Sequence, residues 1–271
     1  MEDRIKPIYI KPLFYEKNPK LARWIPAFFY RYLERVIHQR EINEFITMYG
    51  NRKGLDFADA ILEYLHVSYQ VEGEENLPSP DGSYIFASNH PLGGPDGIIL
   101  ISFLGRRYPE LKFPVNDLLM NLKNLNTIFL PINKHGGQAR LAAAAIDEAF
   151  ASSSQIITFP AGMVSRKYRG KIKDPEWQKS FIAKAIKHQR DIVPLFVTGK
   201  NSALFYNIFR FRQLFGIKLN MEMLLLPRET FRKKNASFTI KIGKPVSWQS
   251  LDKSRTPQEW AKEIQEMVYQ L

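Results

Sequence analysis

The sequence predicts an α/β fold with a mostly parallel central sheet flanked by helices and an N-terminal helical extension. Short apolar segments typical of strands alternate with helical segments from about residue 67 onward, which is the pattern of a parallel sheet with helical crossovers. Helical spacing dominates before that point. The chain has 271 residues, of which 45% are hydrophobic, and this is enough for one sizeable core.

The N-terminal segment, residues 1–66, is predicted to be helical. Pro26 suits the first turn of a helix, and Phe29, Leu33 and Val36 recur at helical spacing, so one helix is expected from Pro26 to about Arg40. Further helices are expected at about 41–49 and 55–64. Aromatic and basic side chains are interspersed along this segment. They suit packing on the rest of the protein, the interpretation we favour, or contact with lipid headgroups.

The segment 67–271 is predicted to be the main domain, with its motifs between residues 84 and 201. Strands are expected at 67–71, 84–88, 113–115, 127–132, 156–159, 192–198 and 238–242, and helices at 138–150, 175–187 and 257–269. Thr256 and Glu259 have the spacing of a capping box, which predicts the start of the last helix.

Charge and residue usage narrow the possible functions. Lys and Arg total 39 against 27 Asp and Glu, and the net charge of +12 favours anionic partners. Cysteine is absent, and the five His show no ligand spacing, so no metal or bound cofactor is expected. No secretory leader is recognisable, and no apolar run approaches the roughly 18 residues that span a bilayer. A cytoplasmic protein with peripheral membrane contact is therefore expected.

The strongest local signal is a His and an Asp on a Gly-rich turn directly after the strand at 84–88. Asn89 and His90 are followed by Pro-Leu-Gly-Gly-Pro and then by Asp96. Open α/β sheets carry their sites at the carboxyl ends of strands. Imidazole can take a hydroxyl proton near pH 7, and an adjacent carboxylate orients it. For this motif alone, a simple turn followed by a helix start remains the alternative.

Three further blocks follow along the chain. Asn133 and Lys134 come at the end of the strand at 127–132, and the segment 192–197 is typical of a core strand. Between them, a strand runs into Phe159-Pro160-Ala161-Gly162-Met163-Val164-Ser165-Arg166-Lys167. The backbone amides and cations of such a loop suit an anion. Taken alone, the loop after Phe159 is equally consistent with a basic solvated loop, and for Asn133 and Lys134 a solvated strand end is the favoured interpretation.

Taken in order, these blocks resemble the phospholipid/glycerol acyltransferase family, which includes bacterial lysophosphatidate acyltransferases. The Asn-His-Pro-Leu-Gly-Gly-x-Asp-Gly form is similar to a bacterial branch often labelled hemolysin-like, which includes enzymes that make acylated amino-acid lipids. Five residues separate His90 from Asp96 where the family has four, Asn133-Lys134 stands where the second block usually ends in Arg, and Ala161 replaces a Glu. These departures favour an acylated amino-acid lipid as acceptor at least as much as lysophosphatidate.

The resemblance implies an O-acyltransferase of membrane lipid biosynthesis at the inner face of the cell membrane. Its donor would be an acyl thioester of acyl carrier protein or coenzyme A, and its acceptor a lysolipid or amino-acid lipid. His90 would be the general base and Asp96 its partner. Lys134, Arg166 and Lys167 would bind the acceptor anion, and backbone amides near Gly162 would stabilise the oxyanion. The full set of implied substrate-binding positions is Asn89, Asn133, Lys134, Phe159, Pro160, Gly162, Ser165, Arg166 and Lys167.

Two other functions remain open from the sequence. A non-catalytic basic protein could bind a membrane or nucleic acid, but no nucleic-acid module is recognisable and no such partner is expected. A hydrolase of the same substrates would use water in place of the acceptor, but no Gly-x-Ser-x-Gly elbow is present.

Overall fold

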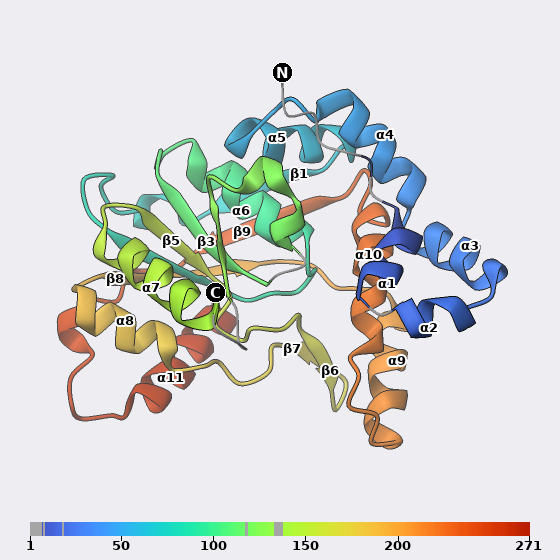
Figure 1. The fold of residues 1–271 in the computed structure, drawn as a ribbon. Coiled ribbons are helices and arrows are strands. Elements are labelled where there is room, and N and C mark those ends of the chain that lie inside the picture. Colours follow the sequence, from blue (N-terminus) through green and yellow to red (C-terminus); the bar gives the residue numbers. More distant parts are fainter. Residues whose placement is uncertain (1–6, 8, 18, 117–118, 133–137) are drawn as a thin grey trace.

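The structure is a computed structural model, and it describes residues 7, 9–17, 19–116, 119–132 and 138–271 (Figure 1). Within these residues, seven strands form one sheet in the order β1-β9-β8-β2-β5-β3-β4. Their bounds are β1 (Ser68–Glu72), β2 (Tyr84–Ser88), β3 (Leu111–Val115), β4 (Phe129–Pro131), β5 (Gln155–Thr158), β8 (Asp191–Val197) and β9 (Ser237–Ile242). The strand that leads into the His90 loop, β2, therefore lies at the centre of the sheet.

The predicted mostly parallel sheet is confirmed. β2 pairs in parallel with both β5 and β8, and antiparallel pairing in this sheet joins β8 to β9. Neighbouring residues of β2 face opposite sides, with Ile85 in one apolar cluster and Phe86 in another. Both faces of the strand are covered, which explains why it is a continuous apolar run.

Helices cover the two faces of the sheet (Figure 1). α5 (Gly54–Tyr64) and α6 (Pro95–Gly105) pack in the cluster that contains Phe86. α7 (Gln138–Ala151), α8 (Ser180–His188) and α11 (Pro257–Gln270) pack in the cluster that contains Ile85. The predicted capping box at Thr256 and Glu259 is present at the start of α11. Short 3-10 turns connect the elements at η1 (Glu74–Asn76), η2 (Leu119–Asn121), η3 (Lys123–Leu125) and η5 (Trp248–Ser250).

A further group of elements, to which the sequence analysis assigns no structure, follows β5 and β8. β6 (Arg166–Tyr168) and β7 (Lys171–Lys173) form a hairpin, and α9 (Ala203–Leu214), η4 (Met221–Leu225) and α10 (Leu226–Phe231) lie between β8 and β9 in the chain. Val164, Phe205, Tyr206 and Leu225 form an apolar cluster of their own. This cluster joins the start of the hairpin to α9.

The N-terminal segment forms α1 (Ile10–Lys17), α2 (Pro19–Trp24), α3 (Ala27–Val36) and α4 (Gln39–Tyr49). The single helix predicted over residues 26–40 is wrong. α3 ends at Val36 because His38 has φ 56° and ψ 42°, a left-handed conformation that an α-helix cannot continue. The His38 ring stacks on Phe231, with 4.6 Å between ring centroids.

The N-terminal helices combine a packed face with an exposed one. Tyr30 and Leu33 are buried in a small cluster with Ile10, whereas Trp24 and Phe28 are 86% and 68% exposed. The segment therefore has buried side chains, as packing on the rest of the protein requires, and exposed aromatic side chains, as contact with lipid headgroups requires. Within the described ranges, no helix is long and apolar enough to cross a membrane.

The predicted start of one helix differs clearly from the structure. The helix predicted at 175–187 begins only at Ser180. The residues before it lie outside the helix, and their amides have distant partners: Trp177 N donates to Gln265 Oε1 (3.3 Å) and Gln178 N donates to Pro160 O (3.0 Å). In addition, α5 belongs to the main core, since Phe57 packs in the same cluster as Phe86.

Candidate active site

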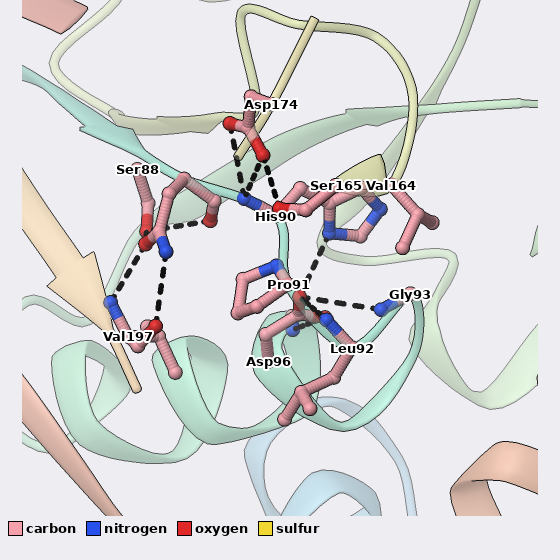
Figure 2. Close-up of polar contacts among 12 residues, drawn as sticks. Ser88, His90, Pro91, Leu92, Gly93, Asp96, Val164, Ser165, Asp174 and Val197 are labelled. Carbon is pink, nitrogen blue, oxygen red and sulfur yellow. Dashed lines mark hydrogen bonds and ion pairs between the residues drawn. The ribbon is translucent and has the colours of Figure 1, made fainter. Parts of the chain in front are cut away.

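His90 and Asp96 lie where β2 ends and α6 begins, at the carboxyl end of the central strand. Pro95 occupies the first turn of α6, and Asp96 is placed beside it with its side chain fully buried. The imidazole points back toward this helix start, and His90 Nδ1 lies 2.9 Å from Asp96 Oδ2 (Figure 2). The sequence spacing of these two residues therefore corresponds to a direct contact.

The Asp96 carboxylate is held as an acceptor by the backbone around it. Its Oδ2 accepts hydrogen bonds from Leu92 N (2.9 Å) and Gly93 N (3.3 Å), and its Oδ1 accepts one from Gly97 N (3.0 Å) (Figure 2). Burial alone would raise the pKa of Asp96, but the charge and hydrogen bond of His90 and the Leu92 and Gly93 amides outweigh it and lower that pKa below its ordinary value. An ionised carboxylate only accepts, so in the neutral form of the imidazole Nδ1 carries the proton and Nε2 presents a lone pair.

The imidazole is also held from its face. The Phe159 ring stacks on it at 3.9 Å between centroids and 17° between planes, and Phe159 packs edge-on against Phe113. The His90 side chain keeps 16% of its surface exposed. No described residue hydrogen-bonds Nε2, so the structure leaves this nitrogen open to a substrate proton.

Asp174, a second buried carboxylate, holds the backbone of His90. His90 N donates to both Asp174 oxygens (3.2 Å each), and Ser165 Oγ donates to the same carboxylate (Figure 2). Trp177 Nε1 also donates to it, at 3.0 Å. Ser165 N in turn donates to His90 O at 2.7 Å. Burial raises the pKa of Asp174, and these donors offset only part of that effect. The carboxylate therefore ties the His90 loop to the segment before β6.

Arg166 lies in a buried ion network. Its Nη2 donates to Glu222 Oε1 at 3.0 Å, and Arg212 Nε donates to Glu222 Oε2 at 3.1 Å, with Arg166 and Glu222 essentially inaccessible. The Arg166 guanidinium also lies over the rings of Phe205 and Phe209. Burial lowers the pKa of Arg166, partly offset by Glu222.

Comparison with known proteins shows which family this chain belongs to. Residues 12–271 match the family described as Acyltransferase. The chain belongs to the acyltransferase family. This confirms the family resemblance drawn from the four sequence blocks and sets aside a non-catalytic binding protein.

Two relatives named lyso-glycine lipid O-acyltransferase are similar to the acyltransferase over its whole length. That of Bacteroides thetaiotaomicron is 44% identical, over 100% of this chain and 99% of its own. That of Phocaeicola vulgatus is 43% identical, over 100% of this chain and 97% of its own. Among solved structures, the 1-acyl-sn-glycerophosphate (LPA) acyltransferase PlsC of Thermotoga maritima has a TM-score of 0.50 and 16% identity and covers 96% of this chain and 94% of that one. This last likeness supports the fold.

The geometry changes the expected role of three implied substrate-binding residues. Asn89 is buried, and its side-chain amide donates to Val197 O (3.0 Å) and accepts from Val197 N (2.7 Å), which links the ends of β2 and β8. Ser165 is buried against Asp174, and Arg166 against Glu222. The expectation that Arg166 offers its guanidinium to the acceptor is therefore corrected, because a carboxylate of the acyltransferase itself occupies it.

The other implied positions are distributed as follows. Phe159 contacts the His90 imidazole, Pro160 accepts from Gln178, and Lys167 is exposed on β6. Gly162 has φ +63° and its amide donates to Phe159 O at 2.9 Å, so that N–H is already used in a turn. Asn133 and Lys134 lie outside the described residues.

Asp174 and Glu222 are the residues that sequence reasoning missed. Asp174 precedes Pro175 in a segment that carries no motif, and Glu222 lies in a region without predicted elements. No group of three or more His, Cys, Asp or Glu side chains that could hold a metal occurs within the part of the chain that the structure describes.

Proposed function

We propose that the acyltransferase transfers a fatty acyl group from an acyl thioester to the hydroxyl of a lyso-glycine lipid at a membrane surface. The observation that carries the proposal is the His90–Asp96 pair with an unbonded Nε2, placed in a chain of this family. The acceptor is inferred from the names of the two relatives, which are similar to this chain along its full length.

The proposed chemistry follows from the protonation of the pair. Nε2 of His90 removes the proton of the acceptor hydroxyl as its oxygen attacks the thioester carbonyl carbon. Asp96 keeps the tautomer correct and stabilises the imidazolium that forms. The new C–O bond is completed as the C–S bond breaks, and the imidazolium returns its proton to the leaving thiolate. The base is thus restored at the end of each cycle.

Stabilisation of the oxyanion is assigned to the turn that follows Phe159. The N–H groups of Met163 and Val164 have no acceptor among the described residues, and Val164 lies beside His90 (Figure 2). Such amides, aimed at the charge that develops on the carbonyl oxygen, are an effective source of catalysis. We therefore assign this role to Met163 and Val164 in place of Gly162.

Recognition of the acceptor carboxylate is assigned to cations near this turn. Lys167 is exposed at the start of the hairpin, and Lys134 stays a sequence-based candidate. A glycine lipid offers a carboxylate where lysophosphatidate offers a phosphate, and Ala161 in place of the family's Glu fits a different acceptor headgroup. The donor is an acyl thioester of acyl carrier protein or coenzyme A, both of which are anionic and suit the net charge of +12.

The test compares acyl transfer by the wild-type protein and by His90→Ala. Purified protein is incubated with labelled acyl-coenzyme A or acyl carrier protein and with lyso-glycine lipid or lysophosphatidate. Loss of the base should lower the rate by roughly 100-fold to 10,000-fold. His66→Asn is the matched control, since His66 is exposed, has φ 48° and takes no part in the site.

The outcomes separate the alternatives. Unchanged transfer in His90→Ala would exclude the proposed base. Preferred use of lysophosphatidate would exclude the glycine-lipid acceptor while leaving the reaction type in place. Loss of thioester without acylated product would identify a hydrolase.

A further inference from the structure

The outer side of α9 carries an apolar stripe that faces solvent. Leu204, Phe211 and Phe215 lie on one side at helical spacing and are 44%, 53% and 62% exposed. Ile208, on the same side, is half-buried and packs against the cluster that contains Phe205. Leu214, the last residue of α9, and Leu219, beyond the helix end, add to the apolar surface and are 79% and 70% exposed. An apolar face of this size on a folded protein is a common mark of an interaction surface.

The opposite side of the same helix is packed, so the stripe is a second apolar face. Phe205, Tyr206 and Phe209 are buried against Val164 and the hairpin. A surface helix normally has one apolar and one polar face. Because the inner face of α9 already serves the fold, the outer face requires a different explanation.

A basic hairpin formed by β6 and β7 lies next to α9 (Figure 1). Tyr168 of β6 contacts the ring of Phe209, and the Arg166–Glu222–Arg212 network fastens the hairpin to α9 and η4. The exposed cations of this surface are Lys167, Arg169, Lys171, Lys173, Arg210 and Lys218.

The charge around the stripe has a single sign. Residues 161–173 and 203–220 contain no Asp or Glu. None of the exposed cations forms an ion pair with a carboxylate in the described ranges. An anionic partner would therefore meet positive charge that the fold has not already neutralised.

We propose that the apolar stripe of α9 and the basic hairpin dock the acyltransferase on an anionic lipid bilayer. A bilayer interface accepts both parts of this surface at once, because apolar side chains enter the acyl boundary while Lys and Arg contact the headgroups. A second copy of the chain would bring like charges together, which disfavours self-association through this face. An acidic protein would pair with the cations, but its charge would not explain why the apolar side chains of Phe215 and Leu214 are exposed beside them.

The surface is connected to the candidate active site. Asn201, just before α9, donates from Nδ2 to Pro91 O in the His90 loop (3.3 Å), and Val164 packs with Phe205 at the start of the helix. The 12 residues of α9 rise by roughly 18 Å. Docking through the stripe would hold His90 at a defined height above the bilayer from which a lipid acceptor arrives. In this respect the inference rests on the proposed function.

The binding test uses vesicles of phosphatidylcholine mixed with phosphatidylglycerol, and vesicles of pure phosphatidylcholine. The bound fraction of full-length protein is measured by sedimentation. Phe211→Ser combined with Phe215→Ser should lower the partition coefficient about tenfold or more on the anionic vesicles. Arg169→Gln combined with Lys171→Gln should lower it about tenfold on the same vesicles, and added salt should reduce this difference.

Matched controls change the same residue types elsewhere on the surface. Leu141 on α7 is 74% exposed, and Leu141→Ser should bind like the wild type. Lys244→Gln combined with Lys253→Gln removes two exposed cations that have no ion pair in the described ranges, and it should also bind like the wild type. Circular dichroism confirms that each variant is folded.

Three results would overturn the inference. The α9 variant could bind as tightly as the wild type. All binding could be lost from Trp24→Ser with Phe28→Ser while the α9 variant is unaffected, which would place the contact on the N-terminal helices. Sedimentation velocity could show that the α9 change converts a dimer into a monomer without altering vesicle binding.

A last comparison separates this inference from the proposed function. With a short-chain, water-soluble acceptor and thioester, the α9 variant should turn over at the wild-type rate, whereas with acceptor embedded in vesicles it should be slower. Wild-type protein that binds vesicles but acylates no acceptor would exclude the proposed function alone. The opposite result would exclude the docking surface alone: the wild-type protein acylates lyso-glycine lipid, and the variants bind vesicles and turn over on them as the wild type does.

Discussion

At the scale of single residues, the candidate site consists of the His90 imidazole and two buried carboxylates that contact different parts of His90. Asp96 contacts the ring of His90, and Asp174 contacts its backbone. The pKa of Asp96 is lowered and that of Asp174 is raised. The difference follows from their partners, because Asp96 faces the imidazole itself whereas burial dominates at Asp174.

The lowered pKa of Asp96 predicts how its contribution to stability depends on pH. A carboxyl whose folded pKa lies below its unfolded value of about 3.9 stabilises the fold above that value and loses the contribution as the pH falls through the folded pKa. Asp96→Asn should therefore unfold more easily by on the order of 1–3 kcal/mol at neutral pH. Urea titrations from about pH 7 down to about pH 3 should show the gap between the two proteins shrinking. A gap that is constant over this range would contradict an ionised Asp96.

At the scale of elements, the ion network around Glu222 joins the hairpin, α9 and η4. One buried carboxylate neutralises two guanidinium groups that come from different elements, Arg166 from β6 and Arg212 from α9. The network explains why Arg166 is buried although it follows a loop that resembles a substrate-binding block.

Replacement of this carboxylate is predicted to destabilise the protein. Glu222→Gln leaves two buried cations without a countercharge and should lower the free energy of unfolding by roughly 3–5 kcal/mol. Urea denaturation measures the effect. Glu263→Gln is the control, because Glu263 pairs with Arg255 at a partly exposed site, where an ion pair contributes at most about 1 kcal/mol. Equal effects of the two changes would argue against a structural role for the network.

At the scale of the whole molecule, the predicted boundary at residue 66 separates segments that share a core. Phe57 of α5 is 2% exposed and packs with Phe45 of α4 and with the cluster that contains Phe86. The exposed part of the N-terminal segment begins further away, around Trp24 and Phe28. The core therefore extends across that boundary, and the segments on its two sides should unfold together in one transition.

The shared core leads to a prediction about cooperativity. Phe57→Ala should lower the stability of the entire protein by about 3–5 kcal/mol, because it leaves a cavity beneath the sheet. Far-ultraviolet circular dichroism and tryptophan fluorescence should report the same shifted transition. Phe28→Ala, at a 68% exposed position, should have little effect. Loss of only a minor, separate transition in Phe57→Ala would instead support an independent N-terminal domain.

The sequence predicted most strands and the His90–Asp96 contact because both depend on short-range order. Strands such as β2 are marked by continuous apolar runs, and α11 by its capping box. His90 and Asp96 lie on a single loop and helix start, so their spacing already brings them together. By contrast, the helix predicted over residues 26–40 is interrupted at His38, whose left-handed conformation could not be predicted from the identity of that residue.

The sequence alone was enough to predict the fold class, the acyltransferase family and the contact between His90 and Asp96. The tertiary structure alone decided the position of Asp174, the buried role of Arg166 and the solvent-facing stripe of α9. Asp174 is 84 residues from His90 in the chain, and Glu222 is 56 residues from Arg166. Periodicity and motif spacing describe neighbours along the chain, whereas these contacts exist because folding brings distant polar groups into the same buried space, where each must find a partner.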